Sequence, residues 1–228
     1  IEFMNLVFMQ EEAYRLNPDF WLEMSVWDGY DGPNRERQYP SMRSLYRKDG
    51  QTYDPARYGG FVQFGMWLLR PRAVREYRGW TFDPEEGMPY FMAIVEAVDR
   101  VHDNPTLREF WRKGRLVPNR AHQHPYQASI PAEYRDVDRW FLLDADVNPR
   151  EHPWKLSADI PVFALALVQG ESPNRRWLVY AHSPVTDRKG VVLTVPDYQD
   201  ITVDVAPAGS FWLVGQQAGT VDRIELAE

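Results

Sequence analysis

The sequence contains no cysteine. This absence excludes disulfide bonds, thiolate metal ligands and cysteine nucleophiles from any account of the fold or its chemistry. It does not decide the compartment, because secreted bacterial proteins can also lack cysteine. Bacterial cytoplasm and secretion therefore both stay open as locations.

Long apolar runs and an excess of positive charge are also missing. The longest apolar runs, such as residues 160–168, are far shorter than the about 20 residues that a membrane-spanning helix needs. The chain has 26 Lys and Arg against 33 Asp and Glu, and its formal net charge is −7. A chain of this charge has no general attraction for nucleic acid or an anionic membrane, so neither is expected as a partner.

Several enzyme signatures are absent as well. The sequence has no GxSxG, GxGxxG, GxxxxGK[ST] or HExxH motif, which argues against serine hydrolases, nucleotide-binding folds and zinc proteases. His122 and His124 have the spacing of two metal ligands, but without an evident third ligand a solvent-facing loop is favoured. His182 is expected as a surface histidine. We expect no cofactor and no metal.

Aromatic residues, in contrast, are abundant. They make up 14% of the 228 residues and include 9 Trp and 12 Tyr. With 44% hydrophobic and 26% charged residues, the chain has the composition of a folded protein of one large or two small domains. Because filling a core needs fewer aromatic side chains, we expect some of them at solvent-accessible positions.

Residues 4–134 are predicted to form an α/β segment. Two strands, Phe20–Trp27 and Phe61–Leu69, share one pattern, with apolar residues at even positions and mixed residues at odd ones. Strands that alternate with helices are typical of a parallel sheet or barrel. The predicted helices are residues 4–16, 70–77, 84–102 and 104–113.

Residues 135–228 are predicted to form an antiparallel β-sandwich, because short apolar runs recur about every ten residues between turns such as Pro196-Asp197. The boundary near residue 135 follows a linker-like segment, 118–131, that is rich in Pro, His and Gln. The predicted strands are residues 139–144, 162–169, 177–182, 190–195, 200–205, 210–214 and 220–226.

Glu23 is the centre of the candidate site. It lies in mid-strand, flanked by Trp21, Ser25 and Trp27, where a carboxylate is costly unless it is paired or faces a wet cavity. In a closed barrel the mixed face would be the lumen, which would place Glu23 and Trp67 in the same interior. The alternative is an ordinary half-exposed strand pair with a solvated Glu23.

Active sites of barrels lie at the carboxyl ends of the strands, so residues that follow the two predicted strands are expected to line the opening. Indole and phenol rings stack on sugar rings, and Asp, Arg and Gln bond to sugar hydroxyls. Asp28 and Asp31 are alternatively calcium ligands, although two adjacent β-turns are favoured. The candidate residues are Glu23 and Asp28 for catalysis and Trp27, Tyr30, Gln63, Trp67 and Arg70 for substrate binding.

The segments Phe20–Trp27 and Phe61–Trp67 resemble the last two strands of a clan A (β/α)8-barrel glycoside hydrolase. In that family the seventh strand ends with the nucleophilic glutamate, and the eighth carries a tryptophan under the sugar. Residues 176–182 and 209–214 resemble strands of the β-sandwich that many such enzymes append.

This resemblance implies that Glu23 is the nucleophile or a stabilising carboxylate, that Trp27 and Trp67 are sugar platforms, and that an oligo- or polysaccharide is the partner. A whole barrel needs about 250 residues. The resemblance therefore implies the carboxyl-terminal part of a longer enzyme, with the acid/base glutamate on other sequence or on another chain.

A non-catalytic carbohydrate-binding or assembly module is the alternative function. In that case the sandwich would bind the sugar, and the α/β segment would be a scaffold. Exposed edges of a two-stranded parallel sheet are templates for pairing, so a homo-oligomer is also expected. The candidate platform of this module consists of Trp140, Trp154, Trp177 and Trp212.

Overall fold

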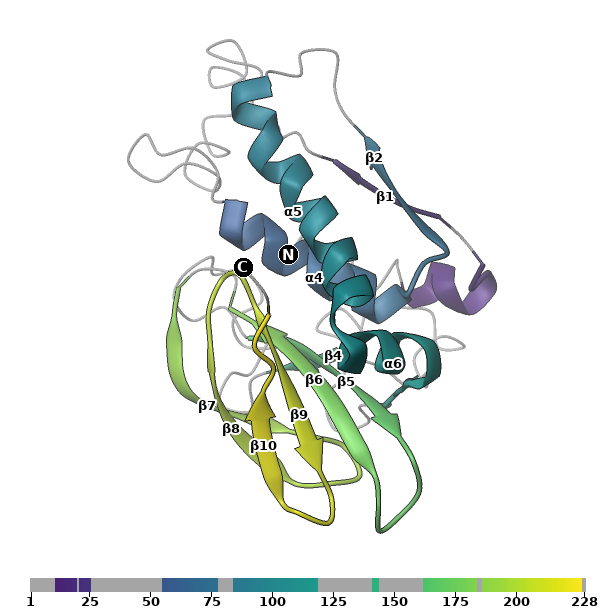
Figure 1. The fold of residues 1–228 in the computed structure, drawn as a ribbon, viewed down its shortest axis with the longest axis vertical. Coiled ribbons are helices and arrows are strands. Elements are labelled where there is room, and N and C mark those ends of the chain that lie inside the picture. Colours follow the sequence, from purple (N-terminus) through teal and green to yellow (C-terminus); the bar gives the residue numbers. More distant parts are fainter. Residues whose placement is uncertain are drawn as a thin grey trace, which may run out of the picture.

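A computed structural model of the chain describes residues 11–19, 21–25, 55–77, 84–118, 141–143, 162–183 and 186–226. Within these ranges the helices lie in the first part of the chain and antiparallel strands dominate the last part (Figure 1). This coarse division, mixed helices and strands followed by a strand-rich region, confirms the sequence-based prediction.

The described helices and strands follow the chain in this order. The helices are residues 11–16, α4 (Pro55–Leu69), α5 (Pro84–Asp103) and α6 (Pro105–Lys113). The strands are β1 (Trp21–Ser25), β2 (Ala73–Tyr77), β3 (Arg115–Leu116), β4 (Phe141–Leu143), β5 (Phe163–Gln169), β6 (Arg176–His182), β7 (Arg188–Thr194), β8 (Asp200–Val205), β9 (Ser210–Gly215) and β10 (Thr220–Arg223).

Helix α6 shows why some predicted boundaries are correct. The side chain of Asn104 accepts hydrogen bonds from the backbone N–H groups of Thr106 and Leu107, at 3.0 and 3.1 Å. Pro105 follows at the first helical position, where a missing N–H costs nothing. Both residues can be recognised in the sequence, so the start of this helix is predicted correctly.

Two neighbouring predictions are wrong. Residues 61–69, predicted as a strand, form the second half of α4, and residues 73–77, predicted within a helix, form β2. Every residue from Val62 to Leu69 is buried, so the even and odd positions have the same surroundings. A segment that is buried all round carries no reliable period, and an apparent alternation in it misleads.

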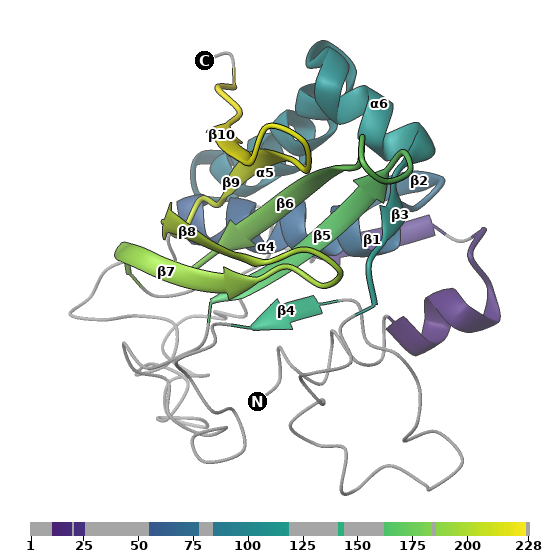
Figure 2. The ribbon, with the colours of Figure 1, turned by 90° about the horizontal axis from the view of Figure 1, so that it is seen from below.

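The largest sheet has the order β10-β9-β6-β5-β3, and β4 also pairs with β5. All these pairs are antiparallel. Strands β3 and β4 pair with opposite ends of β5, at Leu167–Val168 and at Phe163–Leu165 respectively. Figure 2 shows the helices behind this sheet and the antiparallel β7–β8 pair in front of it.

Both faces of the central strands β5 and β6 are buried. In β5, Phe163, Leu165 and Leu167 belong to the hydrophobic cluster that includes α4, α5 and α6. The alternate residues of the same strand, Ala164 and Ala166, belong to a second cluster with the β7–β8 pair. Because successive side chains of a strand point to opposite faces, a strand covered on both sides reads as a continuous apolar run.

The first cluster joins the helices to the carboxyl-terminal sheet. It contains Trp67 of α4 together with Leu178 and Phe211 of the sheet, so these parts share one core. The predicted domain boundary near residue 135 lies outside the described residues and stays a prediction. None of the helices in the described ranges is long and apolar enough to cross a bilayer.

Candidate functional site

Three of the predicted site residues, Trp27, Asp28 and Tyr30, lie outside the described residues. The same holds for Asp31, for the possible ligands His122 and His124, and for two of the candidate platform residues, Trp140 and Trp154. The structure therefore bears on the remaining candidates, which it distributes over two different environments.

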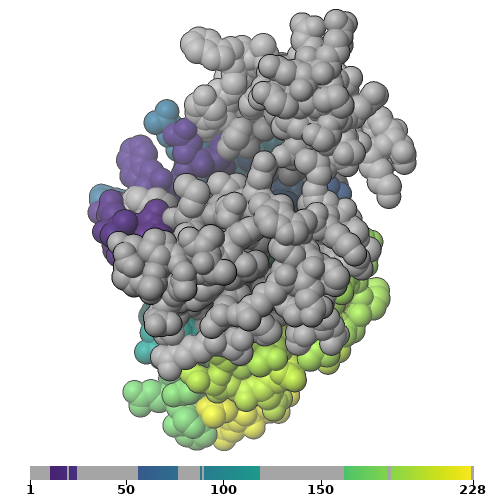
Figure 3. Space-filling view, turned by 180° about the vertical axis from the view of Figure 1, so that it is seen from behind, coloured from purple at the N-terminus to yellow at the C-terminus, as the bar shows by residue number. Residues whose placement is uncertain are grey.

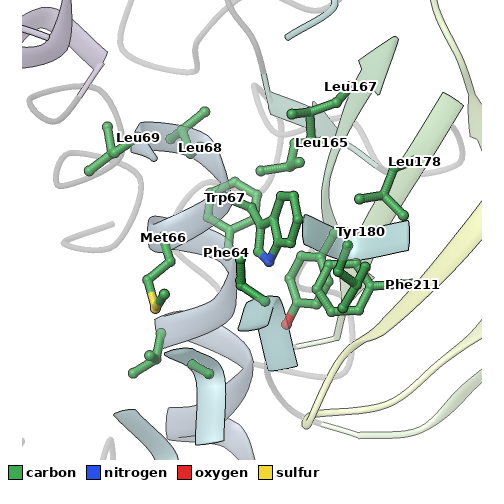
Figure 4. Packing of buried hydrophobic residues seen from close by; sticks show 14 of the residues in the cluster. Phe64, Met66, Trp67, Leu68, Leu69, Leu165, Leu167, Leu178, Tyr180 and Phe211 are labelled. Carbon is green, nitrogen blue, oxygen red and sulfur yellow. The ribbon is translucent and has the colours of Figure 1, made fainter. Parts of the chain in front are cut away.

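Gln63 and Trp67 lie in the core between α4 and the large sheet. Trp67 is fully buried, and its ring makes an edge contact with Phe211 at a centroid distance of 5.3 Å (Figure 4). A second edge contact joins it to Trp111, at 5.1 Å. Nε1 of Trp67 donates a hydrogen bond of 3.1 Å to Oε1 of the buried Gln63. Both side chains were expected to bind substrate; here they fill the core, because their segment is a helix.

Arg70 links the end of α4 to the end of α6. Its Nη1 donates to the carbonyl oxygen of Gly114 and, at 3.5 Å, to that of Trp111. Burial lowers the pKa of Arg70, and the neighbouring Tyr14 side chain acts in the opposite direction. Arg70 was expected to bind substrate, but its guanidinium stabilises the negative end of the α6 dipole.

Glu23 occupies the exposed side of β1. The residues on either side of it in the strand, Leu22 and Met24, pack in the same cluster as Trp67. Side chains alternate along a strand, so Glu23 points away from that cluster. The structure therefore does not bring Glu23 and Trp67 into a common hollow, and the site predicted from their pairing is not formed.

A different set of side chains surrounds Glu23. Strands β1 and β2 are parallel, and their register places Glu23 opposite Arg75. Nε of Arg75 lies 3.6 Å from the Glu23 carboxylate, with the side chains 64% and 46% exposed. Trp21, two residues before Glu23 and on the same side of β1, is 64% exposed.

A second ion pair lies at the start of the two strands. Nη1 of Arg72 lies 3.3 Å from Oδ2 of Asp19, and both side chains are exposed. We call the surface formed by Asp19, Trp21, Glu23, Arg72, Ala73 and Arg75 the exposed β1–β2 face. Figure 3 shows part of the amino-terminal segment that contains β1, in purple, at the molecular surface.

The β1 part of this face was predicted from the sequence, and the β2 part was not. The alternation over residues 20–27 placed Trp21 and Glu23 on the same side of a strand, and the structure confirms that. Arg75 was missed because residues 70–77 were predicted as a helix.

His182 is buried, not at the surface as expected. Its ring lies among Phe61, Phe64, Phe163 and Tyr180, with centroid distances of 4.9, 5.8, 5.9 and 6.0 Å. Burial lowers the pKa of His182 to about 3, because the imidazolium would lose its hydration. His182 is therefore neutral near pH 7 and serves the packing of α4 on the sheet.

The tryptophans of the sheet offer no sugar platform in the described part. Trp177 is fully buried and its ring packs on Tyr198 at a centroid distance of 4.6 Å, and Trp212 is buried in the same cluster. In the described ranges no three His, Asp or Glu side chains are grouped as metal ligands. On the exposed β1–β2 face, an indole, carboxylates and guanidinium groups lie together at the surface.

Comparison of the chain with models of known protein families, with curated proteins and with solved structures finds no match.

Proposed function

We propose that the chain is a glycoside hydrolase-type carbohydrate-active protein that holds saccharide on the exposed β1–β2 face. The observation that carries the proposal is the placement of an exposed indole, Trp21, on the same side of β1 as Glu23, with Arg75 beside the carboxylate. The combination supports a saccharide site because an indole offers a large apolar ring face and the neighbouring charged groups offer hydrogen-bond donors and acceptors.

Each group on the face suits one part of a sugar. The flat Trp21 ring matches the apolar face of a pyranose, which presents its C–H groups. The Glu23 carboxylate accepts hydrogen bonds from hydroxyl groups at several lone-pair positions, and the Arg75 guanidinium has five N–H donors. An exposed ion pair is worth about 0.2–1 kcal/mol, so incoming hydroxyl groups displace it at little cost.

Cleavage of a glycosidic bond makes a further demand. It uses two carboxyl groups, about 5–5.5 Å apart for retention of configuration and about 6.5–9.5 Å apart for inversion. The residue opposite Glu23 is Arg75, and Glu76 follows on the other face of β2. The other described carboxylate of the exposed β1–β2 face, Asp19, pairs with Arg72. Asp28, which lies outside the described residues, is our candidate for the second carboxyl group.

The proposed architecture is the closing segment of a (β/α) barrel followed by a β-sandwich. Parallel pairing of β1 with β2 supports the first part, because parallel strands are joined through helical crossovers such as α4. The second cluster supports the sandwich, since it fills the space between the β7–β8 pair and the large sheet.

The second candidate is a non-catalytic carbohydrate-binding or assembly module. The ion pair between Glu23 and Arg75 favours this candidate. In a hydrolase, a second carboxyl group would act together with Glu23. The sequence predicted that such a module would bind sugar on its sandwich, but Trp177 and Trp212 are buried there. We therefore place the saccharide of this candidate on the exposed β1–β2 face as well, and the two candidates differ in turnover.

A glycan array followed by assays with chromogenic glycosides tests the proposal and separates the two candidates. Binding with turnover that is lost in Glu23→Gln supports a hydrolase, and binding without turnover supports the module. The matched control is Asp204→Asn, which breaks another exposed cross-strand ion pair, with Lys189 at 3.1 Å, and should change neither result. Absence of binding to every glycan would contradict both.

A further inference from the structure

The sheet that carries the exposed β1–β2 face has two strands in the described part of the chain. Its two five-residue strands are parallel, and no third strand of the described residues pairs with either. Parallel sheets are normally covered on both faces, and two-stranded sheets alone are marginally stable. Here the inner face packs on the core, while the outer face exposes Trp21.

The charges on this face are separated by strand. Both acidic groups, Asp19 and Glu23, belong to the β1 side, and both basic groups, Arg72 and Arg75, belong to the β2 side. A surface divided in this way attracts a second copy that is related to it by a two-fold rotation, because the acidic row of each copy then meets the basic row of the other.

The register makes the match specific. Trp21 is opposite Ala73, and Glu23 is opposite Arg75. A two-fold axis parallel to the strands, lying between two facing copies, keeps the height of every residue and exchanges β1 with β2. It therefore places Trp21 over the partner's Ala73 and Glu23 over the partner's Arg75.

The large indole then faces the smallest side chain of the β2 row, and the Glu23 carboxylate gains a second guanidinium. Stacked sheets lie about 10 Å apart, which leaves space for one layer of interleaved side chains. We propose that a second copy of this chain binds on the exposed β1–β2 face, forming a two-fold symmetric dimer through Trp21 and the two charged rows.

The size of the face sets the strength of this dimer. Five residues of strand span about 16 Å, and stable interfaces bury about 1,200–2,000 Å² in total. Two strands cover less than that, so the association is expected to be weak, with a dissociation constant in the micromolar range and a marked dependence on salt.

Self-association does not rest on saccharide binding. It does use the same face, so a bound saccharide and the second copy exclude one another. Saccharide added to the dimer is therefore expected to release monomers.

Sedimentation over a micromolar concentration series tests the dimer in the full chain. The variant Arg72→Glu with Arg75→Glu has an all-acidic face, and Asp19→Arg with Glu23→Arg has an all-basic face. Each is expected to be monomeric alone, and an equimolar mixture is expected to form the heterodimer. Lys189→Glu reverses one charge of an exposed ion pair elsewhere and should leave the association unchanged.

Trp21→Ala keeps every charge in place and does not depend on the fold tolerating reversed charges. It is expected to weaken dimerisation about tenfold or more. A wild-type chain that stays monomeric throughout the series, or folded charge variants that do not associate when mixed, would overturn the inference. Glycan binding by a strictly monomeric wild type would overturn the dimer alone and leave the proposed function intact.

Discussion

The hydroxyl of Tyr180, on β6, donates a hydrogen bond of 2.8 Å to the backbone carbonyl oxygen of Gly60, on α4. This bond joins residues 120 positions apart, and both partners are buried. It lies where the amino-terminal half of α4 meets the large sheet, beside His182. The contact therefore ties the helices to the sheet, and several predictions depend on it.

Tyr180→Phe should lower the free energy of unfolding by about 0.5–1.5 kcal/mol, because it removes a buried hydrogen bond between the sheet and α4. Denaturant unfolding measures this cost. Tyr198→Phe is the control: that ring packs on Trp177 at a half-buried turn, and the substitution keeps the packing. An equal cost for the two variants would contradict the assigned role of the Tyr180 hydroxyl.

Gly209 and Gly219 form a matched pair for backbone substitution, with φ values of +75° and +61°. A Cβ at Gly209 would overlap the Tyr180 hydroxyl, whereas a Cβ at Gly219 would meet nothing within 4 Å. Gly219→Ala should cost about 1–2 kcal/mol for the left-handed backbone alone. Gly209→Ala should cost clearly more, and thermal melts of the two variants that agree would contradict the close approach.

His182 should make stability depend on pH. Its pKa is about 3 in the folded chain and about 6.5 when unfolded, so between these values the unfolded state binds more protons. The stabilisation is complete above pH 6.5 and is lost as the pH falls toward 3, by about 1.4 kcal/mol per pH unit.

Urea midpoints at pH 7 and pH 5 measure this loss. His182→Leu removes the titrating group and keeps an apolar side chain in the aromatic surroundings. Its stability should fall less between the two pH values than that of the wild type. Parallel pH profiles would show that His182 does not carry the effect.

Substitutions at Trp67 and at Trp21 should affect different properties, the first the stability of the fold and the second the affinity for glycans. Trp67→Phe removes part of a fully buried ring and its hydrogen bond to Gln63, so it should destabilise the fold by about 1–3 kcal/mol and leave glycan affinity unchanged. Trp21→Ala alters an exposed side chain and should do the reverse. Melting curves and glycan titrations of both variants distinguish this arrangement from one in which Trp67 holds the sugar.

Local sequence signals predicted the elements whose ends are marked by capping or turn residues. Asn104 and Pro105 mark the start of α6, and the short apolar runs between turns mark β5 to β9. Alternation separated the two sides of β1 correctly, because one side is buried, but the mixed side, which was expected to line a barrel interior, is exposed. Helix α4 has no such contrast, since the core surrounds residues 62–69, and tertiary packing decided its structure.

The candidate site failed where it depended on that segment. Placing Trp67 beside Glu23 required both to lie on strands of one barrel, and a helix instead turns Trp67 into the core. Arg75 was missed for the complementary reason, because its partner strand was predicted as a helix. Local periodicity does not predict which distant segments pair, such as the strands that bring Glu23 opposite Arg75.

Calorimetric titration with oligosaccharides selected on a glycan array tests the central claim most directly. The wild type should bind, and Trp21→Ala should bind at least tenfold more weakly at an unchanged melting temperature. Wild-type affinity in Trp21→Ala would contradict the assignment of the exposed β1–β2 face as the saccharide site.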